Sequence, residues 1–120
     1  MKTKGRTDPK KETLIRNLKG IAIENEAKIW SILAAELSKP NRLRVSVNLS
    51  HLNRVSNSGD ILLIPGKVLG AGALDHDIKI AAESFSNSAQ MKIKNAGGQC
   101  LTIEELIARN PKGAQVRLIK

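Results

Sequence analysis

The chain has 120 residues, with 20 Lys and Arg against 11 Asp and Glu, and a formal net charge of +9 at pH 7. This length predicts one domain, and an apolar content of 41% with 9 glycines is typical of globular rather than disordered chains. The single cysteine, Cys100, excludes an intrachain disulfide and is typical of a reducing compartment. Because the sequence shows neither a secretory signal nor an apolar run long enough to span a bilayer, we expect a soluble cytoplasmic protein.

The positive charge is concentrated in the first half of the chain. Residues 1–54 carry 12 Lys and Arg against 5 Asp and Glu, whereas residues 55–120 carry 8 against 6. Such an asymmetry indicates an electrostatic footprint for nucleic acid or for an anionic membrane. A membrane would require a basic amphipathic helix or a lipid anchor, and the sequence shows neither. Nucleic acid is therefore the favoured partner.

Two basic segments flank the first predicted helices. Residues 1–8 are polar and are interpreted either as a solvated terminus or as a basic arm that orders on RNA. The second segment is a loop around residues 39–44. The cations of the arm and the loop that we expect to contact RNA are Lys2, Lys4, Arg6, Arg42 and Arg44.

Two helices are predicted between these basic segments. The first begins with Asp8 as N-cap and Pro9 in the first helical position, and a break is expected near Asn25. The second ends before Pro40, because a proline disfavours helix at the residue that precedes it. Trp30 lies on the apolar stripe of the second helix, so we expect it in the core rather than as a platform for stacked bases.

Short strands and short helices are predicted for the rest of the chain. Asn48 caps a short helix whose outer face carries His51 and Arg54, three residues apart. Thr102 and Glu105 form a capping box that opens the last helix. The remaining predicted elements are strands at 45–47, 61–64, 78–82, 100–101 and 116–119, and a helix from about 89 to 96 that Gly97 and Gly98 end.

A glycine-rich stretch after residue 64 is predicted to be a loop. It contains Gly66, Lys67, Gly70 and Gly72, and glycine allows tight turns and a close approach of another molecule. The stretch lacks the Ser or Thr that follows the lysine in nucleotide-binding loops. It also lacks the third glycine of the dinucleotide fingerprint, since that position is Asp75.

No other constellation indicates catalysis or a metal. His51, His76 and Cys100 are too widely spaced for a zinc site. Asp75, His76 and Asp77 are typical of a solvated turn, and Cys100 lies in an apparent strand, which favours a buried structural thiol. We therefore expect no catalytic residue, no metal, no cofactor and no small-molecule substrate.

The shortage of aromatic residues restricts how this chain would bind nucleic acid. It has no Tyr, one Phe and one Trp, whereas modules that bind single strands stack bases on aromatic side chains. We expect instead that Arg and Lys contact phosphates, with backbone amides of the glycine loop, and that the ligand is folded RNA.

Three patterns in the sequence are shared with a known family: the pattern from Pro65 to Leu74, the Ala81–Ile93 pattern that includes Lys92, and Gly97-Gly98. In these patterns the chain resembles the archaeal large-subunit ribosomal protein eighteen-e family, which is related to the C-terminal part of bacterial ribosomal protein fifteen. Similar patterns at the start of the first helix and near the end of the chain extend the resemblance over nearly the whole sequence. One departure is Asp8, where many members have Asn; both residues can N-cap a helix.

The resemblance implies a fold and a function. The fold would be α/β, made of short elements, with N-terminal helices packed on an irregular β-β-α superhelical core. The protein would be a structural constituent of the large ribosomal subunit, with ribosomal RNA (rRNA) and neighbouring ribosomal proteins as partners. Beyond the five cations of the arm and loop, the expected RNA contacts are His51, Arg54, Lys67, Gly70, Gly72, Lys112 and Arg117.

Two alternatives stay open at this stage. One is a free-standing RNA- or DNA-binding protein outside the ribosome. The other is a phosphate-handling enzyme that uses Lys67 and the glycine loop.

Overall fold

The structure is a computed structural model that describes residues 9–39 and 45–119. Five of the expected RNA contacts, and the predicted N-cap Asp8, lie outside the described residues. These five contacts are Lys2, Lys4, Arg6, Arg42 and Arg44.

The elements follow the order predicted from the sequence. In the described residues the helices are α1 (Pro9–Asn25), α2 (Lys28–Leu37), α3 (Leu49–Val55), α4 (Asn87–Asn95) and α5 (Ile103–Arg109). The strands are β1 (Val45–Asn48), β2 (Ile61–Leu69), β3 (Lys79–Phe85), β4 (Gln99–Leu101) and β5 (Val116–Leu118). The break near Asn25, the stop at Gly97 and the capping box of α5 are all confirmed.

The strands form one parallel sheet with β2 at its centre, which confirms the α/β class. One edge of β2 pairs with β3, and β3 pairs with β4. The other edge is shared, because β5 lies beside Ile61–Leu63 and β1 lies beside Gly66–Leu69. Parallel strands align their carboxyl ends, so the segments that follow β1, β2 and β3 emerge at the same end of the sheet.

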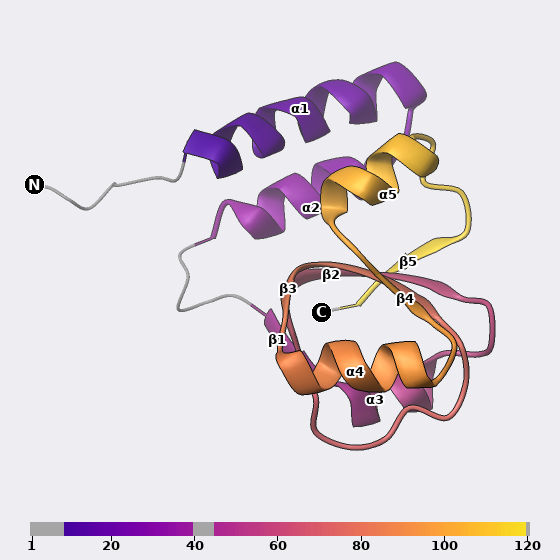
Figure 1. The fold of residues 1–120 in the computed structure, drawn as a ribbon. Coiled ribbons are helices and arrows are strands. Elements are labelled where there is room, and N and C mark those ends of the chain that lie inside the picture. The colour runs from indigo at the N-terminus through magenta and orange to yellow at the C-terminus, as the bar shows by residue number, and fades with distance from the viewer. Residues whose placement is uncertain (1–8, 40–44, 120) are drawn as a thin grey trace, which may run out of the picture.

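Helices cover both faces of this sheet (Figure 1). On one face, α2 and α5 lie against the strands and α1 lies outside them; α3 and α4 cover the opposite face. Two apolar clusters correspond to these two faces. The buried residues of the first include Leu18, Trp30, Leu33, Leu63 and Leu106, and those of the second include Leu49, Leu52, Ile64, Ile80 and Ile93.

Trp30 is a core residue, as its position on the apolar stripe predicted. Its side chain is 0% exposed, and its indole Nε1–H donates a hydrogen bond of 2.7 Å to the backbone oxygen of Pro111. This bond ties α2 to the segment after α5, which lies 81 residues further along the chain. Trp30 is therefore unable to stack on a nucleic-acid base in this fold.

The first part of the glycine-rich stretch is a strand, not the loop that we expected. β2 continues through Pro65, Gly66 and Lys67 to Leu69. A shift in the pairing with β3 between Ile64 and Lys67 accommodates Pro65, which has no N–H to donate. A Cβ atom on Gly66 would collide with the backbone carbonyl of Val45, so glycine here allows β1 to pair closely with β2.

Candidate nucleic-acid interface

The turn that follows β2 is held between the first turns of two helices. We call residues 70–72 the glycine turn. The backbone N–H of Ser50 in α3 donates to the oxygen of Ala71 at 3.0 Å. Side chains on Gly70 and Gly72 would collide with Ser88 of α4 and Ser50 of α3 respectively. Glycine is therefore required at both positions because the helices come so close, and not only because of the turn.

Lys92 of α4 binds the glycine turn from outside. Its Nζ donates to the backbone oxygens of Gly70 at 2.6 Å and Gly72 at 2.7 Å. Reasoning from charge and spacing did not select Lys92, because it lies 20 or more residues from its acceptors. The one sequence signal that could have identified Lys92 was its place in the Ala81–Ile93 pattern, which carries the family resemblance.

Three of the predicted RNA contacts, Lys67, His51 and Arg54, come from the strand before this turn and from α3. Lys67 is exposed on β2, in register with the exposed Ser46 of β1 and Ser84 of β3. His51, next to Ser50, is half-buried, whereas Arg54 is exposed near the end of α3. Lys67 and His51 thus lie toward the carboxyl ends of the strands, where the glycine turn begins.

Two other predicted contacts lie elsewhere. Arg117 is on β5, and its Nη1 donates to the backbone oxygen of Val55 at 2.7 Å and to Asp60 at 3.2 Å. It therefore holds the end of α3 to the sheet. Lys112 is exposed and follows Pro111, which is bonded to Trp30, so it belongs to the side of the sheet covered by α2 and α5.

The helices of the two faces differ in charge. α3 and α4 contain Arg54, Lys92 and Lys94 and no Asp or Glu. By contrast, α1, α2 and α5 together carry six Lys or Arg and five Glu. The face formed by α3, the glycine turn and α4 is therefore the side of the sheet better suited to a polyanion.

The Asp75–His76–Asp77 segment is a bonded turn. His76 Nδ1 lies 2.8 Å from Asp75 Oδ1, and Nε2 lies 2.9 Å from Ser56 Oγ. This order of groups resembles a hydrolase triad, but the Ser56 hydroxyl donates to the backbone oxygen of Leu52 at 2.6 Å. Ser56 is also buried, so its proton and its oxygen serve the end of α3 rather than a reaction.

Hydrogen bonds also set the acidity of this turn. The hydrogen bond from His76, together with one from Asn53, lowers the pKa of Asp75 below its usual value. The pKa of Asp77 is lowered chiefly by its hydrogen bond with Ser58. Both carboxylates are therefore stabilised in their charged form while residues 75–77 are held against α3 and the turn that follows it.

Cys100 is half-buried rather than fully buried. Burial raises the pKa of its thiol, which disfavours the reactive thiolate. Within the residues that the structure describes, no three His, Cys, Asp or Glu side chains gather as a metal site, and none of the helices could cross a membrane.

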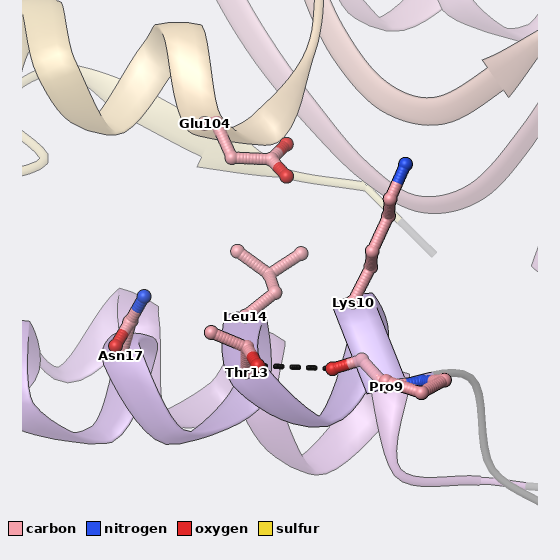
Figure 2. Close-up of a pocket in the computed structure, with 6 residues that line it drawn as sticks. All are labelled: Pro9, Lys10, Thr13, Leu14, Asn17 and Glu104. Carbon is pink, nitrogen blue, oxygen red and sulfur yellow. Dashed lines mark hydrogen bonds between the residues drawn. The ribbon is translucent and has the colours of Figure 1, made fainter.

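A groove lies between the start of α1 and the start of α5 (Figure 2). Its volume is about 370 Å³, and Leu14 lies between Lys10 on one wall and Glu104 on the other. Thr13 in this groove donates within its own helix, to the backbone oxygen of Pro9 at 2.9 Å. The opposite charges of the walls do not favour a phosphate or a nucleic acid here.

Known proteins match this chain along almost its whole length. The family described as "Ribosomal proteins 50S-L15, 50S-L18e, 60S-L27A" matches residues 24–101, from the end of α1 to the end of β4. The chain belongs to this ribosomal protein family. The resemblance seen in the sequence is thereby confirmed.

Curated relatives from archaea bear a single name, "Large ribosomal subunit protein eL18". The one from Methanoregula boonei is 49% identical over 119 residues, which cover 99% of this chain and 98% of the relative. The one from Methanococcus maripaludis is 51% identical over 113 residues, or 94% of each chain. The one from Methanospirillum hungatei is 43% identical over 115 residues, 96% of this chain and 95% of the relative.

Proposed function

We propose that this protein is a structural constituent of the large ribosomal subunit, where it binds and braces folded rRNA and catalyses no reaction. Its family and the names of its archaeal relatives support the ribosomal location. The observation that carries the proposed mode of binding is the surface of α3, the glycine turn and α4, whose helices contain no carboxylate. Neighbouring ribosomal proteins would be its other partners.

Binding would depend mainly on phosphate neutralisation. Cations that meet phosphates release condensed counterions, which gives affinity without sequence readout. Arg54 and His51 would contact phosphates on the α3 side, and the backbone of Gly70 and Gly72 would allow RNA to approach closely. Lys67 would contact a phosphate from the opposite face of the sheet, because its neighbour Val68 is buried under α3 and α4 and successive side chains of a strand alternate between faces.

The remaining contacts would extend this surface. Arg117 would meet RNA at the opposite end of the sheet while it keeps its hydrogen bonds to Val55 and Asp60. Lys112 would meet RNA on the side of the sheet that α2 and α5 cover. The basic arm and the loop would supply Lys2, Lys4, Arg6, Arg42 and Arg44.

The salt dependence of RNA binding tests this proposal. The probe is deproteinised large-subunit rRNA from Methanococcus maripaludis, the source of a relative that is 51% identical. Changing Arg54 and Lys67 together to Ala should weaken binding and reduce the slope of log affinity against log salt by roughly 1 to 2, about one unit for each lost phosphate contact. The matched control replaces Arg16 and Lys19 on α1, where acidic and basic residues are nearly balanced, and should leave the slope unchanged.

Three results would contradict the proposal. An unchanged slope in the Arg54/Lys67 variant would exclude these residues as phosphate ligands. If the protein sediments in the light fractions of a sucrose gradient of native extract even at low salt, it is a free-standing nucleic-acid-binding protein instead. Stabilisation by nucleotides would favour the phosphate-handling enzyme.

A further inference from the structure

The outer surface of α4 carries an exposed stripe that phosphate contacts alone do not explain. Asn87, Gln90, Met91 and Lys94 are all exposed and are spaced one helical turn apart, so they share one face. Met91 is 65% exposed, and in the described part of the chain only Ile23 is a more exposed large apolar side chain. We call these four residues the α4 stripe.

The helix that presents this stripe is firmly held. Ala89 and Ile93, on its opposite face, are fully buried in the second apolar cluster. Ser86 caps its start by accepting from the backbone N–H of Ala89 at 3.2 Å, and the backbone N–H of Ser86 donates to Val68 of β2 at 2.9 Å. Lys92 also joins it to the glycine turn. The α4 stripe is therefore presented by a rigid element, which favours a specific contact.

The chemistry of the stripe fits the minor groove of double-stranded RNA. That groove is wide and shallow and displays ribose 2′-hydroxyls, which both donate and accept hydrogen bonds. The amides of Asn87 and Gln90 can also do both, and the flexible thioether of Met91 suits an irregular apolar surface of sugars. Lys94 would reach a flanking phosphate, and α3 and α4 themselves contain no Asp or Glu. The carboxylates of Asp75 and Asp77 lie beside the end of α3 and are bonded within that turn.

We propose that the α4 stripe docks in the minor groove of an rRNA duplex and positions the protein there through 2′-hydroxyl contacts. This inference rests on the proposed function, because it names the class of RNA structure that α4 would bind. It differs from phosphate binding in that most of the stripe is uncharged, so its contribution to affinity would be nearly independent of salt.

The first experiment removes the uncharged contacts without changing the net charge. Gln90 and Met91 are changed together to Ala, and binding to the same M. maripaludis rRNA is measured over a range of salt. We expect affinity to fall about tenfold with the salt slope unchanged, since one or two hydrogen bonds and a buried thioether are lost. The matched control changes Asn17 and Ile23 on α1 to Ala, which removes the same kinds of side chain from the other face, and should bind like the wild type.

The second experiment locates the groove. A hydroxyl-radical source is attached to Met91→Cys in a Cys100→Ser background, and the same source is attached to Ile23→Cys as control. We expect the source at position 91 to cleave both strands of one rRNA duplex. The source at position 23 should leave that duplex uncleaved.

The outcomes separate this inference from the proposed function. Wild-type affinity of the Gln90/Met91 variant, or no duplex cleavage from position 91, overturns the inference while the Arg54/Lys67 result still supports phosphate binding. If that variant binds free rRNA normally but is lost from assembled subunits, the stripe faces a protein, and the inference is also overturned. Failure of the wild type to bind rRNA overturns both.

Discussion

At the scale of single residues, the glycines of this chain have different structural roles. Gly59 and Gly72 both have a positive φ, of 86° and 92°. Around Gly59 there is open space, whereas a side chain on Gly72 would collide with Ser50 of α3. Backbone conformation alone requires glycine at the first position, and close packing adds to that requirement at the second.

This difference predicts unequal effects of alanine. Gly59→Ala should cost about 1 kcal/mol of stability, because an L residue is strained in the left-handed region. Gly72→Ala should cost roughly 2 kcal/mol or more, since α3 must also move away. Urea denaturation of the two variants checks this, and equal losses would show that the contact with Ser50 carries no cost.

At the scale of elements, α5 depends on its cap. It has only seven residues, too few for a stable isolated helix. The Thr102 hydroxyl accepts from the N–H of Glu105 at 3.0 Å, and the Glu105 carboxylate accepts from the N–H of Thr102 at 2.8 Å. Bonding to the Thr102 N–H lowers the pKa of Glu105. The cap also fixes where β4 ends and α5 begins.

Thr102→Ala should therefore lower the free energy of unfolding by about 1 kcal/mol, the usual loss when an N-cap hydroxyl is removed. The control is Thr13→Ala in α1, an exposed threonine whose hydroxyl bonds back to Pro9 and caps nothing. Its effect should stay within about 0.5 kcal/mol. Urea denaturation measures both, and a Thr102 variant as stable as the control would contradict a stabilising cap.

At the scale of the whole molecule, the sheet separates two differently charged layers. α3, α4 and the glycine turn lie on one side, and the charge-balanced α1, α2 and α5 lie on the other (Figure 1). The network of Asp75, His76 and Asp77 holds the end of α3 to the segment before β3. The stability of the layer formed by α3, α4 and the glycine turn should therefore depend on the carboxylates of Asp75 and Asp77.

This network predicts acid sensitivity. The pKa values of Asp75 and Asp77 are lower in the native state than their ordinary values of about 4, so the unfolded chain binds more protons at acid pH. Their contribution to stability should be present above about pH 4 and should be lost as the pH falls through the native values. Urea denaturation between pH 5 and pH 2 should show a shallower fall for the Asp75→Asn/Asp77→Asn variant than for the wild type, and identical curves would contradict this.

Sequence reasoning predicted the fold better than the candidate site. Apolar spacing, the capping box of α5 and Gly97-Gly98 indicated the elements, because these signals depend on neighbours within a few residues. Asn48 does precede α3 as predicted, but its side chain makes no capping hydrogen bond. The strand through Pro65–Lys67 was missed, since it depends on pairing with β1 and on a register shift that no local pattern reveals. The partners of Lys92 and Arg117 were missed for the same reason, because they lie 20–22 and 57–62 residues away.

The sequence by itself determined the order of the elements, the positive charge, the shortage of aromatic residues and the family. These properties reside in composition and in short-range periodicity, so no folding is needed to detect them. Only the tertiary structure decided which charges share a surface. The parallel sheet places the ends of β1, β2 and β3 together, and thereby joins Ser50, the glycine turn and Lys92 into one surface from three distant segments.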